Sequence, residues 1–84
     1  MNLTFTDNSW REYLAWQVED KKVLKKINSL IKDIQRDAFS GIGKPEPLKY
    51  ELQGCWSRRI TDEHRLVYEV TSYGLTIISC KYHY

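Results

Sequence analysis

The clearest periodic pattern lies between residues 20 and 36, where apolar side chains recur every three or four positions. The recurring residues are Val23, Leu24, Ile27, Leu30, Ile31 and Ile34. Mostly lysines occupy the opposite positions, which is the arrangement of a helix with one buried face. Asp20 precedes the pattern and can accept hydrogen bonds from the first unpaired backbone N–H groups. The pattern predicts an amphipathic helix that begins after Asp20.

A strand and a shorter helix are predicted before this helix. Residues 2–6 alternate in polarity and are rich in strand formers. Asp7, Asn8 or Ser9 can cap the helix after this strand, which breaks near Glu19. Its apolar positions are Trp10, Tyr13, Leu14 and Trp16.

Glycine and proline end the helical pattern, since two of each stand within residues 41–47. Four strands are expected beyond this point, over residues 48–52, 55–61, 64–70 and from 75 onward. Their connections are so short that neighbouring strands must run antiparallel. The element order is β-α-α-β-β-β-β. It predicts an α+β fold in which two helices pack on one face of a curved antiparallel sheet.

Composition indicates one small folded domain. The 84 residues are 42% hydrophobic, with three Trp, six Tyr and two Phe. The apolar runs are too short for a membrane span and no secretion leader is recognised, so we expect a cytoplasmic protein. Cys55 and Cys80 stand in apolar, strand-like runs and are predicted to be buried thiols.

The sequence gives little support for metal or cofactor chemistry. It holds two histidines and no cluster of histidine with paired carboxylates. The glycines before Lys44 lack the spacing of a phosphate-binding loop. We therefore expect neither a metal nor a cofactor. A basic patch is formed by Lys21, Lys22, Lys25, Lys26 and Lys32, and a solvated helix face explains it adequately.

The remaining polar residues fit RNA cleavage by transesterification. In that reaction a base removes the ribose 2′-OH proton, cations stabilise the phosphorane, and an acid protonates the leaving 5′ oxygen. Near neutral pH, Glu46 suits the base and His83 suits the acid. The cations on the intervening strands are Lys49, Arg58, Arg59 and Arg65. Strand alternation directs Arg65 to the face without helices.

Structural interpretations are available for the same residues. Glu46 can form a surface ion pair with Lys44 or Lys49. Arg58 and Arg59 are adjacent on a strand and point to opposite faces, so one of them is expected to be structural.

The aromatic residues and the histidines also have structural interpretations. We assign to the core Trp10, Trp16, Trp56, Tyr68 and Tyr82. His64 stands beside a tight turn and is interpreted as a turn residue without a functional role. His83 can simply face solvent at the end of a strand.

Four segments together resemble a known family. They are residues 43–49 (GKPEPLK), 54–60 (GCWSRRI), 63–68 (EHRLVY) and 82–84 (YHY). In this order the chain resembles the YoeB (Txe) toxins of the RelE superfamily over essentially its whole length. Cys55 departs from the family pattern, in which a larger and often aromatic side chain is expected.

The resemblance implies a compact microbial-ribonuclease-like fold and a bacterial toxin that cuts mRNA in the A site of the 70S ribosome. The positions that match the family's functional residues are Glu46 as general base, His83 as general acid, Lys49 and Arg65 as phosphate and transition-state contacts, Tyr84 as terminal aromatic and Arg59 as a nearby cation. Lys44 and Arg58, which flank these positions, are further candidates for binding RNA phosphate.

The resemblance also implies partners. A YefM-type antitoxin is expected to wrap the toxin with a disordered segment, and the toxin is expected to form a homodimer. Operator DNA is expected to be bound only through the toxin–antitoxin complex. Two alternatives stay open, namely a ribonuclease that acts on free RNA and a non-catalytic basic module that binds RNA or protein.

Overall fold

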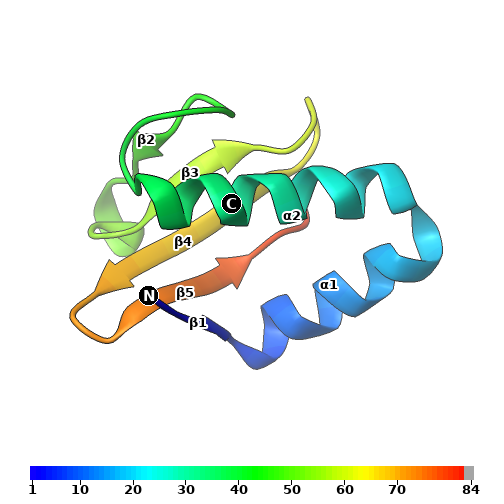
Figure 1. The fold of residues 1–84 in the computed structure, drawn as a ribbon, viewed down its shortest axis with the longest axis horizontal. Helices are drawn as coiled ribbons and strands as arrows, with labels where there is room; N and C mark the ends of the chain where they lie inside the picture. The colour runs from blue at the N-terminus through cyan, green and yellow to red at the C-terminus, as the bar shows by residue number, and fades with distance from the viewer. Residues whose placement is uncertain (83–84) are drawn as a thin grey trace.

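One sheet and two helices make up the computed structural model, which describes residues 1–82. The elements in chain order are β1 (Asn2–Phe5), α1 (Asp7–Glu19), α2 (Lys21–Arg36), β2 (Glu46–Pro47), the 3-10 turn η1 (Tyr50–Leu52), β3 (Trp56–Arg59), β4 (Arg65–Thr71) and β5 (Gly74–Ser79). The strand order is β1-β5-β4-β3-β2, and both helices lie on the same side of the sheet (Figure 1). The predicted α+β class and order of elements are confirmed.

The sheet is mixed rather than wholly antiparallel as predicted. β1 runs parallel to β5, with Asn2 opposite Gly74 and Phe5 opposite Ile77. The other neighbouring strands pair antiparallel. Short turns set the directions of the last four strands, whereas two helices separate β1 from them. No local connection therefore determined the direction of β1.

The strand predicted over residues 48–52 is wrong. The strand here is only Glu46–Pro47, and residues 50–52 form a 3-10 turn. Tyr50 has a φ of 59°, which interrupts an extended backbone. Because β2 is an edge strand, Pro47 can stand there without an N–H to donate. The last strand also ends earlier than predicted, at Ser79.

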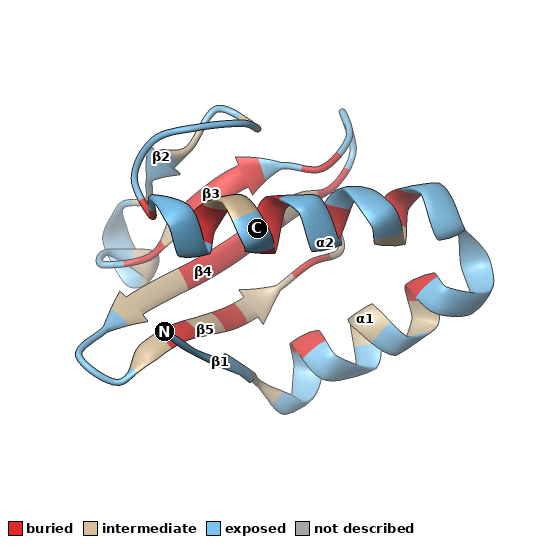
Figure 2. Cartoon of the chain, in the orientation of Figure 1, coloured by how far each residue is buried: buried red, intermediate tan, exposed pale blue. Residues whose placement is uncertain are grey.

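The core lies between α2 and the middle of the sheet. From α2 it takes Val23, Ile27, Leu30, Ile31 and Ile34, and from β4 and β5 it takes Leu66, Tyr68, Leu75 and Ile77. Figure 2 shows buried positions recurring along the side of α2 that faces the sheet. Each large apolar side chain buried in this way contributes about 1.5–3 kcal/mol relative to its exposed state. The amphipathic pattern thus predicted the correct face.

The two helix caps differ in how well they were predicted. Asp20 caps α2 as expected, because its Oδ1 accepts from the backbone N–H groups of Lys22 and Val23 at 3.0 and 3.3 Å. The cap of α1 is Thr6, just before the predicted set, whose Oγ1 accepts from the N–H of Ser9 at 3.1 Å.

The predicted core aromatics separate into two groups. Trp16 and Tyr68 are buried, and Trp56 packs against the core while partly exposed. Trp10 and Tyr82 are 46% and 57% exposed, so their assignment to the core is wrong. Trp10 instead packs beside Phe5 and Tyr13 near β1.

Both cysteines are buried free thiols, as predicted. Burial raises the pKa of Cys80 to about 12. Within residues 1–82, neither helix is long and apolar enough to cross a bilayer.

Candidate active site

Polar side chains from three adjacent strands gather on the sheet face that the helices leave uncovered. Glu46 on β2 lies opposite Ser57 on β3, and Arg59 on β3 lies opposite Arg65 on β4. Directly opposed residues, and residues two apart on one strand, share a face of the sheet. The four side chains therefore lie on one face of the sheet, where Ser57 is buried, and Arg65 lies on the face predicted from strand alternation.

An ion pair joins the predicted base to the predicted phosphate-binding residue. Glu46 Oε1 lies 2.8 Å from Arg65 Nη1, and the two side chains are 53% and 14% exposed. The same Nη1 donates to Ser57 Oγ at 2.8 Å. Arg65 is thus held by two acceptors, while the Glu46 carboxylate stays open to solvent. The alternative ion pair of Glu46 with Lys44 or Lys49 is therefore wrong, since its partner is Arg65.

A small hollow of about 150 Å³ adjoins the ion pair and is lined by Arg59, Thr61, Asp62 and Arg65. Two guanidinium groups at one hollow suit a phosphate, because each can donate two parallel hydrogen bonds to its oxygens. The Asp62 carboxylate opposes part of this attraction. Its lining therefore makes the hollow a candidate anion site next to the predicted base.

Two of the other predicted site residues are close to Glu46 in sequence, and two lie outside the described residues. Lys44 and Lys49 are exposed on either side of Glu46 in the chain, and their binding of phosphate stays a prediction. His83 and Tyr84 lie outside the described residues. The described part of the candidate site therefore consists of Glu46, Arg59 and Arg65.

Arg58 is the candidate that the structure contradicts. Its side chain is fully buried and lies 2.6 Å from the Asp33 carboxylate. Its other acceptors are the Tyr68 hydroxyl and the carbonyl oxygens of Asp37, Ser40 and Ile42. A guanidinium has five N–H donors, and these five bonds occupy all of them. Arg58 has none left for phosphate and instead ties the loop after α2 to the sheet.

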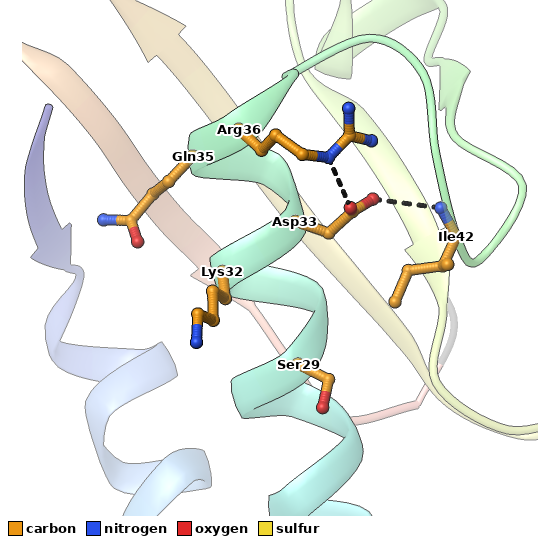
Figure 3. Close-up of a pocket in the computed structure, with 6 residues that line it drawn as sticks. All are labelled: Ser29, Lys32, Asp33, Gln35, Arg36 and Ile42. Atoms are coloured by element: carbon orange, nitrogen blue, oxygen red, sulfur yellow. Dashed lines mark hydrogen bonds and ion pairs between the residues drawn. The ribbon is translucent and has the colours of Figure 1, made fainter.

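Asp33 is the carboxylate at the centre of this network. Figure 3 shows it between Arg36 and the backbone nitrogen of Ile42. Hydrogen bonds from Arg36, Arg58 and that nitrogen hold its pKa at about 2, below the ordinary 3.8. Asp33, Arg36 and Ile42 border a broad hollow of about 640 Å³ on the helix side. Among residues 1–82, none of the predicted catalytic residues lines that hollow, so the Glu46–Arg65 pair stays the candidate site.

The lowered pKa of Asp33 predicts a pH-dependent stability contribution. Because the folded-state pKa lies below the unfolded one, the contribution is complete above about pH 4 and disappears as the pH falls through about 2. We expect Asp33→Asn to destabilise the protein at pH 6, and the difference from wild type to shrink between pH 4 and 2. Urea unfolding over this range measures it. A difference independent of pH would contradict this role for Asp33.

His64 is a residue whose contact the sequence reasoning missed. It completes the predicted turn, since its N–H donates to Thr61 Oγ1 at 3.1 Å. Its side chain, however, is buried, and Nδ1 accepts from the backbone N–H of Tyr82 at 2.7 Å. The available signal was the strand alternation, which sets His64 on the same face as Leu66 and so toward the core.

Comparison with known proteins gives one consistent family. Residues 5–84 match the family model described as YoeB-like toxin of bacterial type II toxin-antitoxin system. The chain is 60% identical to Toxin YoeB of Escherichia coli (strain K12), covering all of both chains. Its fold matches a YoeB dimer from Staphylococcus aureus with a TM-score of 0.93 and 53% identity, covering 100% of this chain and 98% of the other. A YoeB–YefM complex from the same organism matches with a TM-score of 0.92 and 52% identity, at the same coverage.

Proposed function

Because the chain belongs to the YoeB-like toxins of bacterial type II toxin-antitoxin systems, we propose that it stops translation as a ribosome-dependent endoribonuclease. Its substrate is mRNA in the ribosomal A site. The reaction is metal-independent attack of a ribose 2′-OH on the adjacent phosphate. The observation that carries this proposal is the ion pair of Glu46 with Arg65 on the open sheet face.

Each partner in the ion pair has a task in the proposed reaction. The carboxylate of Glu46 is a proton acceptor that solvent and substrate can reach, since the side chain is 53% exposed. When RNA binds, a phosphate oxygen replaces this carboxylate as a partner of Arg65. Solvent reaches the Glu46 side of this pair, since that side chain is 53% exposed against 14% for Arg65, so water can solvate the carboxylate once the phosphate has replaced it. Glu46 is then released beside the 2′-OH.

The remaining charges complete the proposed site. Arg59, which is paired with Arg65 on the neighbouring strand, supplies a second guanidinium to the phosphorane. Lys49 and Lys44 add positive charge for the substrate. His83 protonates the departing 5′ oxygen, and Tyr84 is the terminal aromatic residue that takes part with it. The 2′-OH is the nucleophile, so DNA is not cleaved.

The proposed partners are inferred from the relatives. A YoeB of Staphylococcus aureus forms a dimer, and one forms a complex with YefM. We infer that this chain forms a homodimer and is held inactive by a YefM-type antitoxin in the cytoplasm. Binding to operator DNA occurs only through that complex.

The test compares two substrates and examines the products. We expect purified protein to cut mRNA on translating 70S ribosomes far faster than the same RNA alone, leaving 2′,3′-cyclic or 3′-phosphate and 5′-OH ends. Equal cutting of free RNA would make it a general ribonuclease, and 5′-phosphate ends would exclude attack by the 2′-OH. If the His83→Ala variant still arrests translation and leaves the same cut mRNA, then His83 is not the acid.

A further inference from the structure

The segment after β5 leaves the sheet and is held by side chains of α1. The N–H of Cys80 donates to Oε1 of Glu12 at 2.8 Å, and the Cys80 carbonyl oxygen accepts from Trp16 Nε1 at 2.9 Å. Lys81 Nζ lies 3.0 Å from the Glu19 carboxylate. Backbone groups that leave a sheet need new partners, and here α1 supplies them.

An irregularity in β5 accounts for the change of direction. Ile77 lies opposite Tyr68 and Ser79 lies opposite Val67, so Ile78 is an extra residue on β5. An extra residue of this kind bends its strand and redirects the residues beyond it. The bend separates the segment after β5 from regular strand pairing.

Tyr82 is then held by His64 and by Arg65, the first residue of β4. Its N–H donates to His64 Nδ1 at 2.7 Å, and its carbonyl oxygen accepts from the N–H of Arg65 at 3.3 Å. Tyr82 has a φ of 61°, a left-handed conformation that few residues other than glycine adopt. Such a backbone persists only where its surroundings determine it. The contact to His64 is the shorter of the two.

The imidazole of His64 is itself fixed in place. The residue is 8% exposed, and its ring meets Trp16 edge-on with ring centroids 4.8 Å apart. A neutral imidazole accepts at one nitrogen and carries its proton on the other. Acceptance at Nδ1 therefore places the proton on Nε2, which lies 3.9 Å from Glu63 Oε1.

We propose that His64 is a positioning residue that holds Tyr82, the residue before His83 in the chain, beside Arg65. The inference rests on the proposed function, in which His83 is the acid and Arg65 binds the reacting phosphate. Misplacing a reacting group by about 1 Å can slow a reaction about 100-fold. The hydrogen bond from Tyr82 to His64 therefore affects the cleavage rate more than it affects the stability of the fold.

Two substitutions separate this role from packing. His64→Phe keeps a ring against Trp16 but has no acceptor, whereas His64→Asn loses the ring but keeps an acceptor in place of Nδ1. Positioning predicts that the Phe variant loses about 10–100-fold in kcat with little change in KM, and that the Asn variant retains most of the activity. A packing role predicts the opposite order. Tyr13→Phe, which removes the bond to Asn28 Oδ1 between the helices, is the control and should leave kcat unchanged.

Hydrogen exchange at the Tyr82 amide tests the contact independently of RNA cleavage. We expect exchange about tenfold faster in His64→Phe than in wild type or His64→Asn, with core amides such as that of Ile77 unchanged. Uniform acceleration of all amides in the Phe variant, or wild-type kcat in that variant, would overturn the proposal. Failure of wild-type protein to cleave RNA would instead refute the proposed function, and the exchange result would still stand.

Discussion

Replacing Arg58 with methionine is expected to lower the free energy of unfolding by about 3–5 kcal/mol, because it removes one partner of a buried ion pair. Asp33, with its side chain 17% exposed, loses the guanidinium that lies against it. The carbonyl oxygens of Asp37 and Ser40 lose their donor as well. A domain of this size has only about 5–15 kcal/mol in total. Urea unfolding followed by tryptophan fluorescence measures the loss.

Arg59→Met is the matched control, since it removes the same charge from the next residue on the same strand. Arg59 is exposed on the opposite face, so we expect a stability change within about 0.5 kcal/mol. Arg59→Met should instead lower the rate of RNA cleavage. Equal destabilisation by the two substitutions would contradict the structural role of Arg58, as would an Arg58→Met protein as stable as wild type.

Glu46→Gln is expected to reduce the rate of mRNA cleavage about 10²–10⁴-fold, the usual contribution of a general base. The amide oxygen of glutamine can still accept from Arg65, so the substitution removes basicity and keeps the position. Because the Glu46 side chain is 53% exposed and the amide oxygen keeps an acceptor beside Arg65, stability should change by less than about 1 kcal/mol. Single-turnover cleavage on programmed ribosomes measures the rate, and sedimentation with ribosomes checks that binding persists.

A second carboxylate provides the comparison for this experiment. Glu51 is exposed in η1, close to Glu46 in sequence, and Glu51→Gln changes the net charge equally. We expect it to cleave at the wild-type rate. If Glu46→Gln cleaves as fast as Glu51→Gln, then Glu46 is not the base and the proposed mechanism fails.

The elements that the sequence predicted well are those whose causes are local. The apolar repeat of α2 and the Asp20 cap lie within one segment and need no knowledge of the rest of the chain. β2 was misplaced because the left-handed backbone of Tyr50 interrupts a run that reads as extended. The direction of β1 depends on β5, which lies more than 65 residues further along the chain.

The candidate site divides in the same way. Alternation along β4 was enough to place Arg65 on the open face. Alternation along β3 also required one of Arg58 and Arg59 to be structural, but only the register of β3 on β4, with Arg59 opposite Arg65, determines which. The contact of His64 with Tyr82 depends on an extra residue in β5, and nothing in the local pattern indicates such a bulge.

The position of β5 between β1 and β4 has a consequence for biosynthesis. Synthesis proceeds from the N-terminus, so β1 is made first although its strand partner, β5, is made after the other strands of the sheet. β2, β3 and β4 are neighbours both in sequence and in the sheet and can pair earlier. Leu75 and Ile77 of β5 also complete the core beneath the helices. We therefore expect a nascent chain to lack a finished sheet and core until β5 has emerged.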